Sequence, residues 1–377
     1  MGLLPTISIT GAAVASCLGR SLGVIHEKLL VGIRGLSKDH RFQDWTDAPL
    51  GELPWDLFGV VPGDLEQPDR VARRIVFSLV DELERKTKVF SRYDKHRIGL
   101  FLGTSTCGIK AFENAVSKRR TTQIPLSRTM TLEMQHGWIA DEVTRQFPIG
   151  GFSQTFSTAC SSSALAIAHG YDAVRSGMLD ACIAGGIDIL SPITIMGFDS
   201  LQVLDHSFTK PFQANRAGIN LSEGGGLLLL ERTGEEVLGR ILGYGAQTEA
   251  HHMTHPSPGG EIMELAMVKA LEQSGVAAAD ISYVNAHGTG TIANDEAEGQ
   301  AIHRLFADRA LFHSTKEFHG HTLAGSGALE LAVTLAVLNA WPQWQGKRGN
   351  SNEPTALCNS FAFGGNNVSL CVAGGRS

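Results

Sequence analysis

One cysteine in the sequence has the surroundings of a nucleophile. Cys160 follows the segment QTFSTA and precedes SSSALAIAHG, which predicts a turn between a strand and a helix. A thiol at the start of a helix faces the positive end of the helix dipole, which lowers the thiol pKa and favours the thiolate. Its small neighbours leave room for a substrate carbonyl. The residue is therefore a candidate for thioester formation, with a buried structural cysteine as the alternative.

Two histidines occur in glycine-containing segments with candidate partners nearby. His287 lies in NAHGTGT directly after an apolar run, and His321 lies in KEFHGHTLAGSGALE. The end of a strand is a common place for a ligand-facing group, and capping of a loop is the alternative for His287. Lys316 lies five residues before His321, and Glu330 lies nine residues after it. These two can form a buried ion pair that fixes the loop and tunes the histidine.

A cysteine and two histidines together indicate one class of reaction. The cysteine takes an acyl group, and two neutral imidazoles direct their N–H groups at one carbonyl to stabilise an enolate. Loss of CO₂ from a malonyl thioester generates that enolate, which then attacks the acyl-cysteine in a Claisen condensation. A Cys–His hydrolase would need only one histidine with an Asn or Asp partner. The segment NSFAFGGNN can supply an oxyanion-binding N–H and an aromatic gate, or can simply form a tight turn.

Other polar clusters have simpler interpretations. We interpret His319 as a neighbour of His321 without a chemical role. The segment AHHMTHPSP contains His251, His252 and His255. We interpret it as a loop rather than a metal site, because it contains prolines and the spacing of its histidines suits a metal poorly. The basic residues Arg70, Arg73 and Arg74 lie close together in the sequence. They indicate either a solvated helix face or a docking site for an acidic partner.

Composition narrows the function further. The chain has 377 residues, with 32 Lys and Arg against 38 Asp and Glu, so its net charge is −6 and a general nucleic-acid binder is excluded. The six cysteines lack CxxC spacing and are typical of reduced core residues. No apolar run approaches the ~18 residues of a membrane span, and the N-terminus lacks the features of a signal peptide. We therefore expect a cytoplasmic protein without a membrane span.

Strands alternate with helices along the chain, which predicts an α/β fold with parallel-rich sheets covered on both faces. Predicted strands span residues 6–16, 97–106, 154–160, 180–190, the adjacent pair 224–232 and 237–248, and two strands within 355–373, and residues 281–291 are predicted as a strand followed by a loop. Predicted helices span residues 23–36, 69–86, 161–177, 263–275, 294–306 and 327–341, with a surface excursion at 40–68. The 161-residue separation of Cys160 and His321 hints at two similar halves that meet near residue 232.

These motifs, nearly end to end, resemble β-ketoacyl-acyl carrier protein synthases of the elongating I/II class. The segments that carry the resemblance are SITGAAVASCLG, STACSSS, KPFQANRAGINLSEGGGLLLLE, NAHGTGTIANDEAE, KEFHGHTLAGSGALE and NSFAFGGNN. The resemblance implies a thiolase fold, with two similar halves that form a five-layered α-β-α-β-α arrangement. It assigns residues 1–232 to the half with the nucleophile and 233–377 to the half with both histidines.

The resemblance also implies roles for individual residues. It implies Cys160 as the acyltransferase nucleophile, His287 and His321 as the decarboxylating pair, and Lys316 with Glu330 as their support. The oxyanion hole would be formed by the backbone N–H groups of Cys160 and Phe363, and the Phe363 ring would gate the acyl pocket. Contacts to phosphopantetheine are implied for Thr289 and Thr291.

Family members need no metal and no dissociable cofactor, because phosphopantetheine arrives on the acyl carrier protein. They are dimers, so a homodimer or a heterodimer with a related subunit is expected. The sequence departs from the family pattern at five positions: Gln213, Ala217, Ser222, Ala362 and Asn366. Its connection at 341–354 is also shorter than the family's. These departures leave open the length of the acyl chain and whether the pathway makes fatty acids, polyenes or polyketides.

Three alternatives to an elongating synthase follow from the same residues. A non-catalytic partner subunit like a chain-length factor typically lacks the cysteine. A non-decarboxylating thiolase uses a second cysteine, for which Cys358 is the candidate. A priming synthase usually has one histidine and one asparagine in place of the two histidines.

Overall fold

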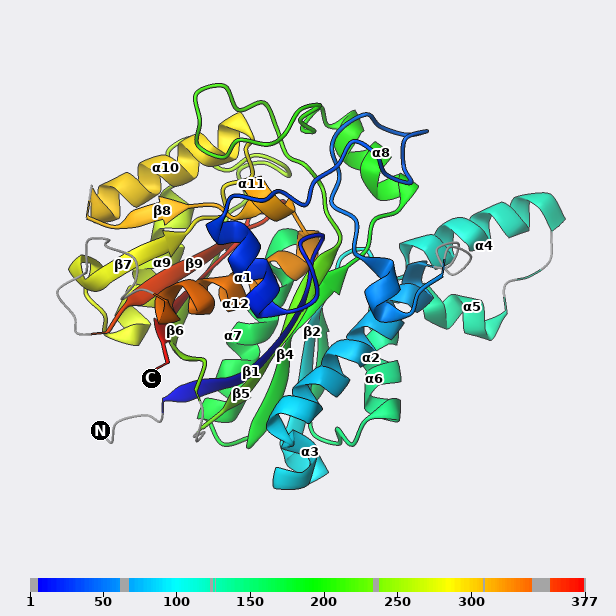
Figure 1. Ribbon diagram of the computed structural model, residues 1–377, viewed down its shortest axis with the longest axis horizontal. Coiled ribbons are helices and arrows are strands. Elements are labelled where there is room, and N and C mark those ends of the chain that lie inside the picture. The colour runs from blue at the N-terminus through cyan, green and yellow to red at the C-terminus, as the bar shows by residue number, and fades with distance from the viewer. Residues whose placement is uncertain are drawn as a thin grey trace.

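Ten strands form one mixed sheet in a computed structural model that describes residues 6–61, 68–122, 125, 127–232, 237–307, 309–340 and 353–375 (Figure 1). Their order is β3-β2-β4-β5-β1-β6-β10-β9-β7-β8. The strands are β1 (Ile7–Ala15), β2 (Ile98–Gly103), β3 (Ser153–Phe156), β4 (Ala181–Asp188), β5 (Gly224–Glu231), β6 (Gly239–Thr248), β7 (Ile281–Asn285), β8 (Leu311–His313), β9 (Thr355–Phe361) and β10 (Asn366–Gly374).

The strand order shows an internal duplication. From the sheet edge to its centre, the first half reads β3-β2-β4-β5-β1 and the second reads β8-β7-β9-β10-β6. Each strand of the first half thus has a counterpart five strands later in the chain. The halves join where Ile7, Ser8 and Ile9 of β1 pair with Gly239 to Ile241 of β6. The predicted boundary at residue 232 adjoins residues 233–236, which lie outside the described residues, and it stays a prediction.

Helices cover both faces of each half and complete five layers. The middle layer is α7 and α12, which contact each other and both halves of the sheet (Figure 1). Helices α2 and α6 cover the outer face of the first half, and α9 with α10 covers that of the second. The helices are α1 (Leu22–Leu30), α2 (Pro68–Thr87), α3 (Val89–Arg92), α4 (Ile109–Thr122), α5 (Arg128–Glu133), α6 (Trp138–Gln146), α7 (Ser162–Arg175), α8 (Pro192–Ser200), α9 (Glu261–Ser274), α10 (Ile292–Phe306), α11 (Lys316–His319) and α12 (Ser326–Asn339).

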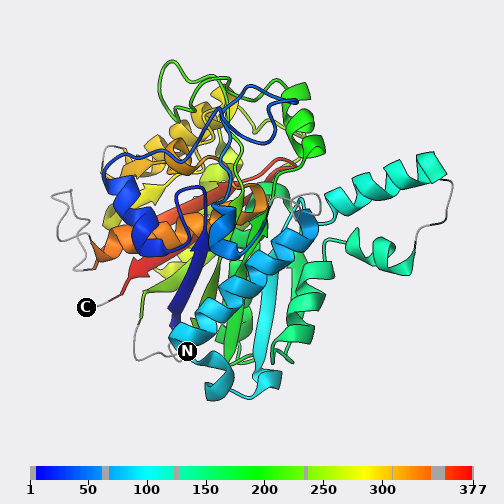
Figure 2. The same cartoon turned by 45° about the vertical axis from the view of Figure 1, so that its right-hand side comes forward.

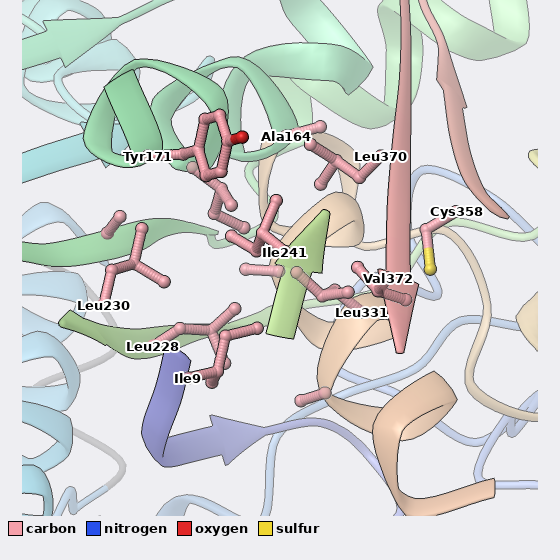
Figure 3. Close-up of a cluster of buried hydrophobic side chains, with 14 of the residues drawn as sticks. Ile9, Ala164, Tyr171, Leu228, Leu230, Ile241, Leu331, Cys358, Leu370 and Val372 are labelled. Carbon is pink, nitrogen blue, oxygen red and sulfur yellow. The ribbon is translucent and has the colours of Figure 1, made fainter. Parts of the chain in front are cut away.

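The main hydrophobic core lies around the middle layer, where strand residues such as Leu228 and Val372 surround α7 and α12 (Figure 3). Helix α12 buries nearly every side chain of its first three turns, as expected for a helix that is apolar on all sides. Burial of so much apolar surface is the main stabilising contribution to a fold of this kind. The core therefore holds the first turns of α7 and α12, which carry the chemistry, in fixed positions.

Two predictions about the sheet are wrong. The sheet is mixed rather than parallel-rich: only the β2–β3, β2–β4, β7–β8 and β7–β9 pairs are parallel, and the other five pairs are antiparallel. Strands β5 and β6 are also not neighbours, because β1 lies between them. A continuous apolar run shows that a strand is buried on both faces, but it contains no information on strand direction or order.

Residues between the predicted elements form more structure than the sequence indicated. The described part of the 40–68 segment, which was expected as a surface excursion, buries Phe42 and Leu50 in a small core beside Ile195 of α8, and residues 62–67 lie outside the described residues. Helices α4, α5, α6 and α8 were not predicted, and α4 with α5 projects from the body as an arm (Figure 2). Within the described residues, no helix combines the length and apolarity needed to cross a bilayer.

Candidate active site

Cys160 lies in a strained turn that joins β3 to α7. A 3₁₀ turn at Ala159–Ser161 leads directly into the helix, and Cys160 is buried at 6% exposure. Ala159 has a φ of 51°, a left-handed conformation that is uncommon for residues with a Cβ. Such strain often occurs at functional turns. We call residues 157–163 the nucleophile elbow.

The second half repeats this turn before α12. A 3₁₀ turn at Leu323–Gly325 leads into the helix, and Leu323 has a φ of 50°. We call residues 321–327 the histidine elbow. Superimposing the two patterns matches Ala159 with Leu323, and therefore Cys160 with Ala324. The 161-residue separation of Cys160 and His321 suggested that these two residues occupy equivalent positions in the two halves. That alignment is wrong by three residues, because both loops are rich in small residues and their sequences alone do not fix the register.

The structure brings Cys160, His287 and His321 into one site. The cysteine sulfur and one nitrogen of each imidazole all lie within 4.8 Å of one another. The two imidazole rings are 5.2 Å apart between centroids and nearly perpendicular, at 81°. His287 follows β7, and His321 follows α11, so three distant parts of the chain converge. Cysteine and imidazole donors at this spacing also suit a metal ion by chemistry, so the expected absence of a metal stays a prediction.

Backbone contacts orient His321. The N–H of Leu323 donates to its Nδ1 at 3.2 Å, and the Ser326 hydroxyl lies 2.7 Å from the same nitrogen. Because Nδ1 accepts a hydrogen bond, the neutral ring has its proton on Nε2. That Nε2 is buried and has no hydrogen-bond partner among the described residues. His321 therefore presents a free N–H donor to the cavity beside the cysteine.

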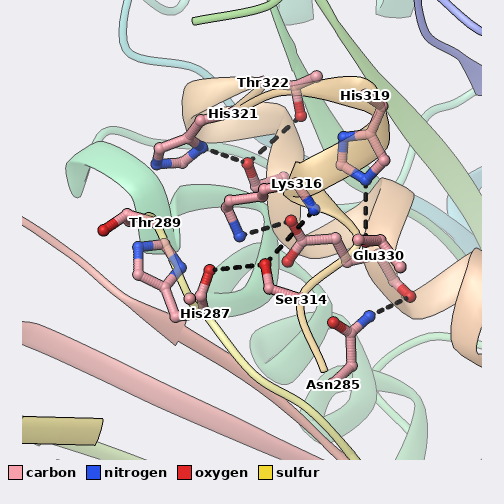
Figure 4. A network of polar contacts seen from close by, with 12 residues as sticks. Asn285, His287, Thr289, Ser314, Lys316, His319, His321, Thr322 and Glu330 are labelled. Atoms are coloured by element: carbon pink, nitrogen blue, oxygen red, sulfur yellow. Dashed lines mark hydrogen bonds and ion pairs between the residues drawn. The ribbon is translucent and has the colours of Figure 1, made fainter. Parts of the chain in front are cut away.

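A buried ion pair supports the two histidines (Figure 4). The Lys316 Nζ lies 2.5 Å from Glu330 Oε1, and the two side chains are 1% and 2% exposed. Burial, reinforced by the Lys316 ammonium, holds the pKa of His287 and His321 well below the usual range for histidine. Both imidazoles are therefore neutral at physiological pH. This is the protonation state that enolate stabilisation by two N–H donors requires.

The thiol does not have the lowered pKa that was expected from the helix dipole. Burial raises the pKa of Cys160 to about 11, and the charge of Lys316 and the backbone N–H of Phe363 only partly offset this effect. The expectation is wrong because a fully enclosed thiolate loses its hydration, and this loss outweighs the favourable helix end. Without a bound substrate, the sulfur is a thiol at neutral pH.

Phe363 also lies near the sulfur, in the turn between β9 and β10. Its ring stacks on Phe198 of α8, with centroids 5.9 Å apart and planes at 22°. Gly364 and Gly365 follow it with φ values of 83° and 77°, which favour glycine. The Gly364 N–H donates to the carbonyl of Met253 at 2.8 Å. The gate candidate is thus followed by a turn that needs glycine and that is attached to a neighbouring loop.

Cys160 lies where two cavities meet. The larger, of about 800 Å³, is lined by both histidines and by Thr289 and Thr291, whose hydroxyls lie 2.9 Å apart. The smaller, of about 650 Å³, is mainly apolar and contains neither of these histidines. Cys160 and Phe363 line both cavities. An acyl chain on the sulfur can thus occupy one cavity while a second substrate approaches through the other.

Two buried carboxylates at the site were missed from the sequence. Glu298 of α10 accepts the backbone N–H groups of His287 and Gly288, each at 2.8 Å, and burial raises the pKa of this carboxyl to about 7. Asp188 at the end of β4 accepts bonds from the loop after β2 and from the Ala324 N–H at 2.9 Å. The available signal was an acid in an otherwise apolar segment, as in ACIAGGIDIL.

The remaining candidate residues have structural partners. Ser222 donates to the Gly51 carbonyl at 3.1 Å, and Ala217 lines the larger cavity. The three histidines of AHHMTHPSP lie at the larger cavity, and within the described residues the only group with metal-like spacing is the cysteine and its two histidines. The arginines of the basic helix face are engaged within the chain, by Glu133, Glu142 and the Gly59 carbonyl.

Comparisons with known proteins identify the family of the chain. The family models Beta-ketoacyl synthase, N-terminal domain, and Beta-ketoacyl synthase, C-terminal domain, match residues 6–236 and 238–341. The 3-oxoacyl-[acyl-carrier-protein] synthase 2 of Synechocystis is 28% identical, over 97% of both chains. The chloroplastic 3-oxoacyl-[acyl-carrier-protein] synthase II of Arabidopsis thaliana is 28% identical over 97% of this chain and 75% of its own.

Solved structures show the same fold. A ketosynthase in complex with its chain length factor from Xenorhabdus doucetiae is 29% identical, with a TM-score of 0.82 and 99% coverage of both chains. A beta-ketoacyl synthase from Burkholderia phymatum is 25% identical, with a TM-score of 0.85 over 99% of this chain and 100% of that one. The fold is therefore the thiolase fold of condensing enzymes. The chain belongs to the β-ketoacyl synthase family and is a condensing enzyme of the acyltransferase class.

Proposed function

We propose that the chain elongates acyl groups by decarboxylative Claisen condensation at Cys160. The observation that supports this most directly is the convergence of one sulfur and two neutral imidazoles where two cavities meet. An acyl carrier protein delivers its chain as a thioester. The Cys160 sulfur attacks the thioester carbonyl, the carrier's thiol leaves with a proton, and the acyl group stays on the enzyme.

In the second stage, a malonyl thioester enters the larger cavity. The Nε2–H of His321 and an N–H of His287 donate to its thioester carbonyl, so the C–C bond to the carboxylate breaks, CO₂ leaves and the electron pair forms an enolate. The enolate carbon attacks the acyl-cysteine carbonyl. Backbone N–H groups of Cys160 and Phe363 stabilise the resulting oxyanion, which collapses with release of the Cys160 sulfur.

The two main alternatives fit the structure less well. A chain-length-factor-like subunit needs no nucleophile, yet Cys160 lies with both histidines in one cavity. A non-decarboxylating thiolase needs a second reactive cysteine, but Cys358 lines neither cavity, and burial raises its pKa to about 12. The residues present therefore favour the decarboxylating reaction.

The same features bear on partner and location. We infer that the carrier's phosphopantetheine lies along Thr289 and Thr291, because both line the passage to the sulfur. No cofactor of the chain's own is required for this chemistry. The similarity to the Xenorhabdus doucetiae ketosynthase, which was solved in complex with its chain length factor, supports a dimer, either of two copies or with a related subunit. Six free cysteines are compatible with a reducing cytoplasm.

Incubation with an acyl-carrier protein, followed by intact-mass measurement, tests the proposal. The wild-type chain should gain the mass of one acyl group, and Cys160→Ala should gain none. Cys358→Ala is the matched control and should acylate normally, because that residue lies outside both cavities. An adduct on Cys160→Ala, or its loss in Cys358→Ala, would overturn the assignment of the nucleophile.

A further inference from the structure

The smaller cavity offers very little polar surface to a ligand. Four of its lining residues carry hydroxyl groups, and each hydroxyl is already hydrogen-bonded within the protein. Ser105 donates to Asp188, Thr106 to the Ile189 carbonyl, Ser200 to the Gly197 carbonyl, and Thr194 pairs with Ser191. The hydroxyl protons of Ser105, Thr106 and Ser200 are thus engaged within the protein, so these residues offer a ligand only the remaining lone pairs of their oxygens.

His136 is different. It lies between α5 and α6 at the base of the arm, is half-buried and lines the smaller cavity. Its Nδ1 lies 2.7 Å from the Cys107 carbonyl oxygen. Because a carbonyl can only accept, Nδ1 has the proton, and Nε2 of the neutral ring has a free lone pair. Among the described residues no group forms a hydrogen bond to this Nε2, and the atom is not fully enclosed by the protein.

We propose that His136 selects acyl chains that carry a hydrogen-bond donor, such as a hydroxyl group, on the segment inside the smaller cavity. This inference rests on the proposed function, because it takes the acyl chain on Cys160 as the occupant. A hydroxyl on the chain would donate to Nε2. A plain alkyl chain would displace water from Nε2 and leave the acceptor unpaired, and sites built around such a polar group discriminate strongly against ligands that lack its partner.

The orientation of His136 makes this selectivity specific. Its ring is held by the Cys107 carbonyl, and Cys107 itself is buried at 2% exposure. The lone pair of Nε2 is therefore presented in a fixed direction rather than by a freely rotating side chain. Phe112 and Ile193 provide apolar surface in the same cavity. The matching ligand is then a largely hydrocarbon chain with one donor group at a defined depth.

A competition experiment tests the proposal. Carrier proteins are loaded with ω-hydroxyacyl chains of several lengths, each paired with the alkyl chain of equal length. The rate of Cys160 acylation is followed by intact mass. We expect the wild-type protein to prefer the hydroxylated chain by about tenfold at the length that reaches Nε2, in line with the loss of one buried hydrogen bond. His136→Leu should lose this preference.

Two further variants make the result decisive. His136→Gln should retain the preference, because its amide can donate to the Cys107 carbonyl and accept from the hydroxyl. His303→Leu replaces an exposed histidine of α10 that lines neither cavity, and it should behave like the wild type. Equal hydroxyl-to-alkyl ratios in wild type and His136→Leu at every length would overturn the proposal. If neither chain acylates Cys160 in any protein, the proposed function itself fails instead.

Discussion

The nucleophile elbow and the histidine elbow have the same backbone but different chemistry. In both, a non-glycine residue with a φ near 50° starts a 3₁₀ turn that leads into a helix of the middle layer. At the first elbow the next residue is Cys160, and at the second it is Ala324, whose N–H binds Asp188. The reactive group of the second elbow lies three residues earlier, at His321. Duplication thus supplied two equivalent turns, and substitutions at different positions made them complementary.

The two elbows are also in contact. The Ser163 hydroxyl accepts the N–H of Ala328 at 3.1 Å, and Gly327 packs against Ala164. This contact between the first turns of α7 and α12 is the reason that Cys160 and His321 lie close together. Their proximity depends on small residues at the crossing rather than on the reactive residues themselves.

The largest expected effect separates the two elbows by function. His321→Ala should slow decarboxylation of a malonyl thioester by about 10²- to 10³-fold, because it removes one donor to the developing enolate. Ser157→Ala, at the matching position of the nucleophile elbow, should release CO₂ at the wild-type rate. CO₂ release from malonyl-carrier protein measures both. A normal rate in His321→Ala would remove this residue from the mechanism.

The ion pair behind the histidine elbow gives an effect of comparable size, on stability rather than on rate. Lys316→Met should lower the free energy of unfolding by about 3–5 kcal/mol, because it leaves the Glu330 carboxylate buried without a partner. The double variant Lys316→Met/Glu330→Leu should recover most of that loss in urea unfolding. In the double variant the pKa of His287 and His321 should rise, since Lys316 lowers both, and NMR titration of the imidazole protons would show it. Unchanged histidine titration would contradict the assigned role of the ammonium.

A smaller effect tests the contact between the elbows. A Cβ added at Gly327 would lie 2.9 Å from both the Cβ and the N of Ala164. Gly327→Val should therefore cost about 1–3 kcal/mol of stability in thermal or urea unfolding. Gly23 of α1 has no atom near its missing Cβ, and Gly23→Ala should be neutral or stabilising by up to about 1 kcal/mol. Equal stability of the two variants would argue against a tight crossing.

The smallest effect asks whether the elbow geometry alone is sufficient for reaction. Ala324→Cys in a Cys160→Ala background places a thiol at the equivalent position of the second elbow. Ala324 is fully buried and lines neither cavity, so we expect no acyl adduct by intact mass. An adduct on this variant would show that either elbow can present a nucleophile.

The sequence predicted most of the chemistry and less of the geometry. Cys160, His287 and His321 were recognisable because each lies beside a run of small residues, and such local patterns are visible in one sequence. The register of the duplication and the order of β5, β1 and β6 were not, because they depend on contacts between distant segments. The thiol pKa was misjudged for the same reason, since burial of Cys160 comes from residues throughout the chain.

The role of Cys358 and the helices of the arm also depend on contacts between distant segments. Cys358 stayed open from the sequence, and only the cavity walls place it away from the reacting groups. The helices of the arm were missed because their amphipathic pattern is weak, yet His136 at their base lines the smaller cavity. Residues that define a pocket from a flanking segment have no local signature.

The thiol pKa of about 11 has a consequence for the enzyme between turnovers. Peroxide and electrophilic metabolites react with thiolates far faster than with thiols. A resting molecule keeps almost all of its sulfur in the protonated form at neutral pH. We therefore expect the idle thiol to react slowly with such electrophiles at neutral pH.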